Sequence, residues 1–351
     1  MIGHLAYAEG SPCPTLVLDS RHLPEDEGRL LAVLTGIRGE LTDMGGGHVL
    51  KIALVRPSTH PMFDLDYRFV QAMPQAPDCF ELRGSCGHSV LAGVSTASRA
   101  GLLPPLFPGS RVRVNVLNNG DGIVCEADRV DRQSALFTVR FIRVPPTPVR
   151  RLLMTGEPVN PLIAAGGRRA VSLVNGANPY AFVDGRELGV PDAAALFAAG
   201  EELAVALEEV RGAATDLLGW PRTGAFPKVA AVVPEDGALA VRALSVPSWH
   251  PTIALTGAVC LSVAAAVPGT VVARMAREAG TGAESVEIRT PGGRTRTESV
   301  LAPGPDGAGD ALCWTSVDGK KVTLLGSYAL DHFSRAYRKE ETRWLHLPAH
   351  T

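Results

Sequence analysis

The sequence predicts an α+β protein of two similar halves, each built from many short strands around one buried helix. Short β-branched or alternating runs, bounded by Gly, Pro, Asn or Asp, recur along the whole chain. Two segments of small, apolar residues also read as helices, and each contains a cysteine, Cys86 or Cys260. These cysteines lie about half of the 351-residue chain apart. This spacing suggests a duplicated architecture, although the two halves share little sequence.

The strand pattern divides the chain into two domains. In the first half we expect strands at 15–18, 49–55, 111–116, 122–125 and 136–142. In the second half we expect strands at 170–174, 180–183, 229–233, 239–244 and 322–325, a helix at 191–212 and hairpins over 279–310. The proline-rich residues 145–148 form a stiff approach to the boundary. The expected domains are 1–157 and 158–329, with 330–351 returning to the first domain.

The segment from Arg83 to Gly93 predicts a reactive cysteine at a helix start. Gly84 and Ser85 lead to Cys86, and small or apolar residues follow to about Arg99. A helix N-terminus carries partial positive charge, which favours the reactive thiolate form of a cysteine. Its free N–H groups can hold a substrate carboxylate. The alternative is a small, buried cysteine at a tight helix entry.

Residues 253–267 predict a helix through the middle of a domain, with Cys260 on its early turns. The segment is apolar all round, which is typical of a helix buried in a core or in a membrane. Its length of about 15 residues falls short of the roughly 20 needed to cross a bilayer. A core helix is therefore expected.

Composition excludes several classes of function. The formal net charge of −2 lacks the positive excess that is typical of proteins that bind nucleic acid or an anionic membrane. Residues 1–9 do not read as a signal peptide, so the cytoplasm is the expected location. Six cysteines without a CxxC pair argue against a disulfide framework and a zinc site. The scarcity of lysine, with abundant Ala, Gly, Pro and Val, is typical of a GC-rich bacterial genome.

Several short motifs resemble the PrpF family, in order from about residue 40 to 270. Asp43-Met44-Gly45-Gly46-Gly47 and then Lys51-Ile52-Ala53-Leu54-Val55 resemble the family's glycine-rich turn and lysine-bearing strand. Ser85-Cys86-Gly87-His88 is similar to its Ser-Cys-Gly-Asn helix start. Further matches are Leu153 to Gly156, Asn178 to Val183, Pro227 to Val229 and His250 to Thr270.

The resemblance implies a fold and an activity. The family includes 2-methylaconitate and methylitaconate isomerases and an oxalomesaconate tautomerase. Its fold is that of diaminopimelate epimerase, with two similar domains, each a mixed β-barrel around a central helix. The active site lies in the cleft between them, and no cofactor is used. A small unsaturated carboxylate is the implied substrate.

Moving a C=C bond along a carboxylic acid needs a base and an acid, and the resemblance gives these roles to Cys86 and Lys51. Each proton transfer can contribute about 10²–10⁴-fold to the rate. Cys86 can fill one role if the helix start lowers its pKa. Lys51 can fill the other, or hold the carboxylate or enolate. The alternative for Lys51 is an edge-strand lysine that blocks aggregation.

Other residues are candidates for binding the substrate. Backbone N–H groups of Gly45, Gly46, Gly47 and Gly87 can hold carboxylates, or these glycines serve turn geometry alone. The side-chain and helix-start candidates are Arg83, Ser85, His88, Cys13, Thr256, Gly257 and Cys260. His88 replaces the family's asparagine, and it can bond a carboxylate, shift the base or be a satisfied helix-terminal histidine. Cys260 is expected to pack the second helix rather than react.

One departure from the family pattern concerns the substrate. The family carries Arg-Gly-Gly-Thr-Ser-Lys-Gly near its N-terminus, whereas this chain reads Glu9 to Thr15, with Cys13 in place of a serine. The family's late Ala-Arg-Arg segment is also not recognisable near residues 324–328. The lost basic groups favour a less acidic substrate than methylaconitate. One such class is the conjugated imine diene of 4-alkylproline pathways in specialised metabolism.

Three functions remain open at this level. The first is a cofactor-independent C=C isomerase. The second is a two-cysteine racemase or epimerase, which requires Cys86 and Cys260 to face each other across the cleft. The third is a non-catalytic binding or accessory protein on the same scaffold. The oligomeric state is also open, with a homodimer as one option.

Overall fold

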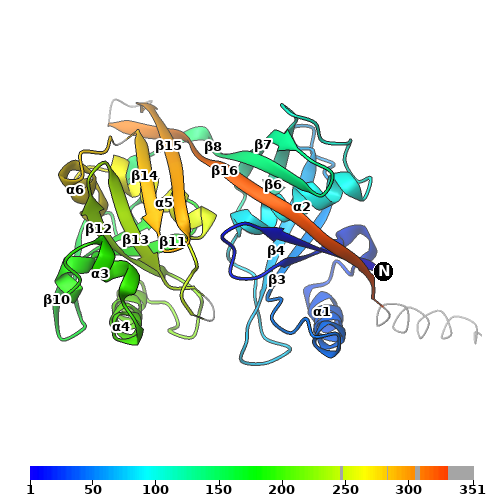
Figure 1. Cartoon of the computed structure of the whole chain (residues 1–351), viewed down its shortest axis with the longest axis horizontal. Coiled ribbons are helices and arrows are strands. Elements are labelled where there is room, and N and C mark those ends of the chain that lie inside the picture. Colours follow the sequence, from blue (N-terminus) through cyan, green and yellow to red (C-terminus); the bar gives the residue numbers. More distant parts are fainter. Residues whose placement is uncertain (246–247, 283, 305–308, 331–351) are drawn as a thin grey trace, which may run out of the picture.

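The computed structural model describes residues 1–245, 248–282, 284–304 and 309–330. Two β-rich lobes lie side by side, and two long strands, β8 (Ser134–Pro148) and β16 (Asp310–Ala329), run between them (Figure 1). Each lobe holds one central helix, as the sequence predicts. The helices and the long mixed sheet make this an α+β fold, as expected.

The first lobe is a closed barrel. Its strands follow the order β1-β2-β3-β4-β6-β7-β8-β16, and pairing of β1 with β16 closes the ring. The strands besides β8 and β16 are β1 (Ile2–Ala8), β2 (Thr15–Asp19), β3 (Lys51–Pro57), β4 (Leu65–Ala72), β6 (Arg111–Val116) and β7 (Gly122–Val130). A short strand, β5 (Phe80–Glu81), pairs with the end of β4.

Helix α2 (Gly87–Arg99) runs inside this barrel. Every residue from Gly87 to Ala97 is buried, and the small residues among them let the helix pack closely against the strands. At Gly93, for example, a Cβ atom would lie 3.0 Å from Val55 Cγ1. The outer face of the barrel sheet is covered by α1 (Glu27–Asp43), which buries an apolar stripe at helical spacing. The buried residues of that stripe are Leu30, Leu34, Ile37 and Leu41.

The second lobe repeats this plan around α5 (Leu255–Ala266). Its strands are β9 (Asn160–Ala164), β10 (Gly167–Asn175), β11 (Pro179–Asp184), β12 (Lys228–Glu235), β13 (Ala238–Ala243), β14 (Ser285–Thr290) and β15 (Gly293–Pro303). Helix α5 is buried from its start through Ala265. In the described part of the chain, no single helix is long and apolar enough to cross a membrane, although the bent pair of α5 and α6 (Val271–Glu278) together passes by length and composition.

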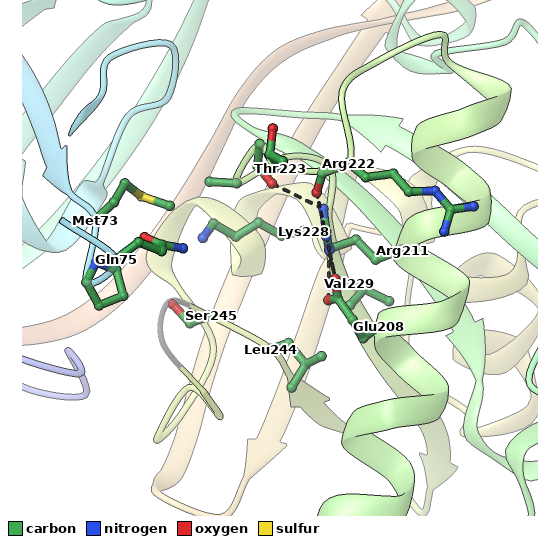
Figure 2. A pocket seen from close by; sticks show the side chains of 13 residues that line it. Met73, Gln75, Glu208, Arg211, Arg222, Thr223, Lys228, Val229, Leu244 and Ser245 are labelled. Atoms are coloured by element: carbon green, nitrogen blue, oxygen red, sulfur yellow. Dashed lines mark hydrogen bonds and ion pairs between the residues drawn. The ribbon is translucent and has the colours of Figure 1, made fainter. Parts of the chain in front are cut away.

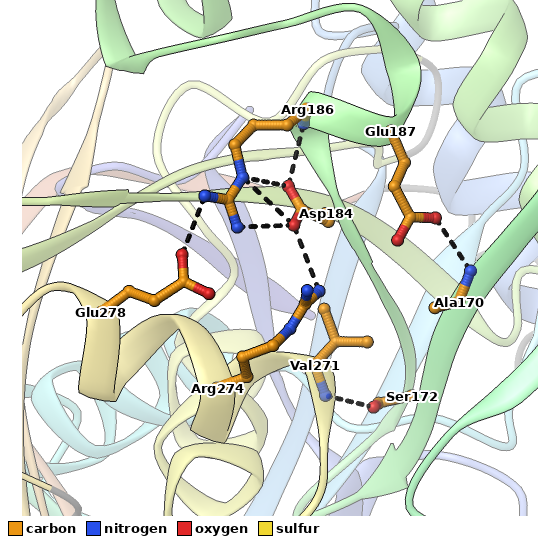
Figure 3. A network of polar contacts seen from close by, with 8 residues as sticks. All are labelled: Ala170, Ser172, Asp184, Arg186, Glu187, Val271, Arg274 and Glu278. Carbon is orange, nitrogen blue, oxygen red and sulfur yellow. Dashed lines mark hydrogen bonds and ion pairs between the residues drawn. The ribbon is translucent and has the colours of Figure 1, made fainter.

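A buried carboxylate holds α6 against β11. Asp184, the last residue of β11, accepts hydrogen bonds from Arg186, which lies just after the strand, and from Arg274 on α6 (Figure 3). Arg186 also pairs with Glu278 at 2.8 Å. The charge of the Asp184 carboxylate is thereby compensated. This network fixes the far side of the second lobe and leaves the face between the lobes to other residues.

Three predicted elements differ from the observed ones. The helix expected at 191–212 is two helices, α3 (Ala193–Ala198) and α4 (Glu201–Leu217), because the chain is extended at Ala199 and Gly200 is the N-cap of α4. Residues 145–148, expected as a stiff approach to the boundary, continue strand β8 to its end, where Pro148 pairs with Ala311. The late strand at 322–325 is only part of β16.

The domain boundaries stay a prediction. Strand β16 pairs with β15 through its first half and with β1 through its second half, so it contributes to both lobes. Leu330 is buried against the first lobe, and its amide donates to the carbonyl of Met1. Residues 331–351, which the sequence analysis returns to the first domain, lie outside the described residues.

Candidate active site

A small cavity between the lobes contains the two residues that were expected to carry the chemistry. We call it the Cys86 cavity, and it encloses about 30 Å³. The first lobe lines it with Lys51, Phe69, Gln71, Glu81, Gly84, Ser85 and Cys86. The second lobe lines it with Asn178, Ala225, Phe226, Lys228, Ser245, His250, Ala254 and Thr256. Both lobes are therefore needed to form it.

Cys86 is the N-cap residue of α2. Its backbone is extended, and its carbonyl accepts hydrogen bonds from the amide of Val90 and the hydroxyl of Tyr67. Burial acts to raise the pKa of the Cys86 thiol, but the charge of Lys51 and hydrogen bonds from Ser89 and Lys51 outweigh it. The net effect is a pKa below the ordinary thiol value. The thiolate is the favoured form for proton abstraction.

Lys51 is the first residue of β3 and is buried. Its Nζ donates to Ser11 Oγ at 2.8 Å, and Ser11 Oγ in turn donates to the carbonyl of Cys13. The loop between β1 and β2 thus holds the ammonium group beside Cys86. Burial raises the pKa of Cys13, whose thiol also lies close enough to Lys51 to interact with its charge. Of these two thiols, Cys86 is the more acidic.

The starts of the two central helices are joined by Asn178. Its side chain accepts from the amide of Ser85 and donates to the carbonyl of Ser85 at 2.7 Å. It also donates to Thr256 Oγ1 at 3.1 Å, which connects the starts of α2 and α5. Glycine is needed at Gly87 and Gly257, where a Cβ would lie 2.6 Å from Leu255 and 2.4 Å from the Tyr180 hydroxyl.

Lys228 also reaches this cavity, although the sequence analysis gave it no role. It begins β12, and its Nζ lies 5.5 Å from the centre of the Phe226 ring. Among the residues that the structure describes, no carboxylate pairs with it. Burial and the charge of Lys51 lower the pKa of Lys228 to about 8. The scarcity of lysine and the Pro227-Lys228-Val229 match were the available signals.

The glycine-rich turn and Arg83 lie outside the Cys86 cavity. Gly45 and Gly46 follow the end of α1, where their amides donate to the carbonyls of Thr42 and Leu41. Gly47 is exposed nearby. Arg83 forms an ion pair with Glu81 at 2.7 Å and lines a different pocket. Neither the turn nor this arginine is brought to Cys86, while Gly87 and Ser85 are.

His88 is fully buried and stacks on His250, with the ring centres 5.9 Å apart. Neither ring nitrogen of His88 has a hydrogen-bond partner within the described part of the chain. Burial, followed by the charges of Lys51, His250 and Lys320, holds the pKa of His88 well below its usual value. The ring is therefore neutral. His250, unlike His88, lines the cavity.

Cys260 lies inside α5, away from the Cys86 cavity. Its thiol donates to the carbonyl of Val174 at 3.1 Å and accepts from the amide of Gly176 at 3.3 Å. Burial raises the pKa of Cys260 to about 12, although the hydrogen bond from Gly176 and the charge of Arg143 oppose this. Within this arrangement the Cys260 thiol acts as a packing group with two backbone partners.

Comparison with known proteins gives the family. Residues 10–301 match the family model described as "PrpF protein". The chain is 27% identical to the 3-methylitaconate isomerase of Eubacterium barkeri, over 82% of this chain and 88% of that protein. It is 28% identical to the (4E)-oxalomesaconate Delta-isomerase of Novosphingobium sp. (strain KA1), over 84% of this chain and 85% of that protein.

Solved structures show the same fold. A methylitaconate-delta-isomerase superposes with a TM-score of 0.66 at 22% identity, covering 93% of this chain and 95% of that one. A hydroxyproline epimerase from Agrobacterium vitis superposes with a TM-score of 0.60 at 16% identity, covering 93% and 90%. At this identity the likeness concerns the fold alone. The family model, which spans most of the sequence, goes further: the chain belongs to the PrpF family.

Proposed function

We propose that this PrpF-family isomerase moves a C=C bond in a small unsaturated carboxylic acid by proton transfer through Cys86 and Lys51. The observation that carries the proposal is the buried pair itself. Lys51 lies close enough to Cys86 to lower its thiol pKa, and both side chains line one cavity between the lobes. The two named relatives are isomerases of 3-methylitaconate and oxalomesaconate, which supports this reaction class.

The pair supplies a base and an acid in the same resting state. The Cys86 thiolate takes the proton next to the double bond, and the electrons spread over the allylic carbons and the carboxylate. The Lys51 ammonium then gives its proton to the far carbon, so the double bond has moved by one position. The proton on sulfur passes back to the neutral amine, which restores the thiolate and the ammonium. Each transfer contributes about 10²–10⁴-fold, and no cofactor enters this sequence.

The helix starts add electrostatic stabilisation. Cys86, the N-cap residue of α2, lines the cavity, so the partial positive charge of this helix start can stabilise a carboxylate that becomes more negative during the reaction. Asn178 keeps this end of α2 fixed against the start of α5. A cavity assembled from rigid elements holds the reacting carbon near both proton-transfer groups.

We further propose a substrate that is less acidic than a tricarboxylate. Among the residues that the structure describes, two lysines line the Cys86 cavity: Lys51, which interacts with Cys86, and Lys228. An unpaired buried carboxylate would be costly, so few carboxylates can be accommodated. An unsaturated intermediate of specialised metabolism, such as the imine diene of 4-alkylproline pathways, meets this requirement. The two-cysteine epimerase gains no support, because Cys260 is occupied by backbone partners.

The test is proton exchange in deuterated water. The wild type is incubated with candidate unsaturated acids, including 2-methylaconitate and smaller acids, and the products are examined by NMR. Deuterium should appear at the reprotonated carbon, because a sulfur or nitrogen acid exchanges with solvent before it donates. The Cys86→Ala, Lys51→Ala double variant should show no exchange. Full turnover by that double variant would exclude the proposed chemistry.

A further inference from the structure

A second cavity adjoins the Cys86 cavity and encloses about 300 Å³ (Figure 2). We call it the outer pocket. The two share Ala225, Lys228 and Ser245, so these residues stand between them. Its remaining walls come from both lobes: Met73, Pro74 and Gln75 from the first, and parts of α4, β12 and the segment 222–225 from the second.

The two cavities differ in volume by about tenfold, so they can hold different parts of a ligand. About 30 Å³ around Cys86 holds little more than one water-sized group, whereas ligand sites for small molecules are commonly about 300 Å³ or more. An unsaturated acid of several carbons therefore cannot lie wholly beside Cys86. When its reacting carbons reach the thiol, the rest of the molecule needs an adjoining space, and the outer pocket is the one that shares Lys228 with the Cys86 cavity.

Apart from Lys228, the charged groups that line the outer pocket already have partners. Arg211 binds Glu208 and donates to the carbonyls of Arg222 and Gly224. Arg222 is paired with Asp216, and its guanidinium points away from the pocket (Figure 2). An arginine whose donors are taken offers little to a second substrate carboxylate.

Lys228 differs from these arginines. Its side chain extends toward Gln75 and Met73 at the junction of the two cavities (Figure 2). No described carboxylate forms an ion pair with its ammonium group, which lies 5.5 Å from the centre of the Phe226 ring and interacts with the charges of Cys86 and Glu81. A partly buried charge without a partner is costly, and a carboxylate placed there would compensate it.

We propose that Lys228 binds the carboxylate of the substrate and that the outer pocket holds an uncharged substituent. The substrate class is then an unsaturated monocarboxylate with a neutral tail of several heavy atoms. Met73, Pro74, Ala225 and Leu244 offer apolar contacts to such a tail, and Gln75 and Ser245 can each hydrogen-bond to it. The reaction on this ligand rests on the proposed function above, but its binding does not require turnover.

Binding of saturated acids tests this directly. Isothermal calorimetry compares acetate, hexanoate and hexanedioate with the wild type and with Lys228→Gln. Each fully buried methylene contributes roughly a fourfold gain in affinity, so hexanoate should bind at least about 10-fold tighter than acetate. Hexanoate should also bind at least about 10-fold tighter than hexanedioate, since the second carboxylate meets no free cation. Lys228→Gln should weaken hexanoate by about 10-fold or more.

Two further variants control for folding and charge. Lys228→Arg keeps a cation at the junction and should hold hexanoate within a few-fold of wild type. Lys321→Gln removes an exposed lysine on β16 that lines neither cavity, and it should leave the dissociation constant unchanged. An unchanged dissociation constant in Lys228→Gln, or tighter binding of hexanedioate than of hexanoate, would overturn the inference.

The result also separates this inference from the isomerase proposal. If hexanoate binding depends on Lys228 but no unsaturated acid exchanges protons, the binding site stands and the reaction fails. If exchange proceeds in Lys228→Gln with an unchanged KM, the reaction stands and the role of Lys228 is excluded.

Discussion

The two central helices each carry a cysteine, and the two thiols differ in chemistry. Cys86 precedes the first turn of α2, next to the Lys51 ammonium, and its pKa is lowered despite burial. Cys260 lies within α5 between the carbonyl of Val174 and the amide of Gly176, and burial raises its pKa to about 12. Both residues are buried, so burial alone does not set reactivity.

The difference follows from position along the helix and from the nearest charge. The Cys86 side chain lies at a helix start, where the first backbone amides have no partner within the helix. The Cys260 side chain lies in the middle of a helix and packs against the surrounding strands. The second lobe does place a lysine near the cleft, Lys228, but it is far enough from Cys260 that its charge does not contribute to that thiol's pKa. The two lobes are thus similar scaffolds, and of their two central helices only α2 starts with a thiol beside a cation.

The largest expected effect concerns turnover. Cys86→Ala and Lys51→Ala should each lower kcat by at least about 10²-fold, the size of one lost acid–base group. Cys260→Ala should stay within a few-fold of wild type. Steady-state kinetics on the substrate found by proton exchange measures this, with circular dichroism as the check on folding. Equal losses in the Cys86 and Cys260 variants would remove the distinction between the two helices.

The next effect is on thiol reactivity. Lys51→Met should raise the pKa of Cys86, because burial is then opposed by fewer favourable interactions. The rate at which iodoacetamide alkylates Cys86 at pH 7.5 should fall by about 10-fold. The pH at which this rate rises should also be higher than in the wild type. Mass spectrometry of individual peptides separates Cys86 from the exposed Cys79. Cys260 should stay unmodified in both proteins.

Much of this arrangement was predictable from local sequence. The two helix segments are recognisable because long runs of small apolar residues are typical of buried helices. Helix α2 begins one residue after Cys86, and α5 begins at Leu255, two residues inside the expected range 253–267. The fold class and the pairing of Lys51 with Cys86 came from short motifs that resemble a family.

The remainder depends on contacts that no local pattern encodes. Strand β16 joins both lobes, and its pairings with β1 and β8 connect residues more than 100 positions apart, so the short run at 322–325 in its second half showed only part of it. Lys228 becomes a candidate only because β12 pairs with β11 and brings it opposite Cys86. Gly45 and Gly46 show the converse, since their amides are used to end α1 and are not free for a ligand.

A smaller effect concerns stability in the second lobe. Cys260→Ala should lower the free energy of unfolding by about 1–3 kcal/mol, because the amide of Gly176 and the carbonyl of Val174 each lose a buried partner. Cys260→Ser retains a donor and an acceptor and should lose less. Urea unfolding followed by fluorescence measures both variants. A loss of activity larger than the loss of stability explains would give Cys260 a chemical role.

The smallest effect is a pH dependence at the point where the two halves meet. His88 and His250 stack there, and burial, with the charge of Lys51, holds the pKa of each well below its usual value. The folded protein keeps both rings neutral, whereas the unfolded chain takes up protons below about pH 6.5. The free energy of unfolding should therefore fall as pH drops from about 6.5 toward the lowered pKa.

The variant His88→Asn removes one of these groups. Between pH 7.5 and 5.5 its free energy of unfolding in urea should therefore fall by about 1 kcal/mol less than that of the wild type. His60→Asn, at an exposed position, should follow the wild type. If His88→Asn has the same pH dependence as wild type, the ring is charged or solvated in the folded protein, and the two halves do not meet in a dry contact.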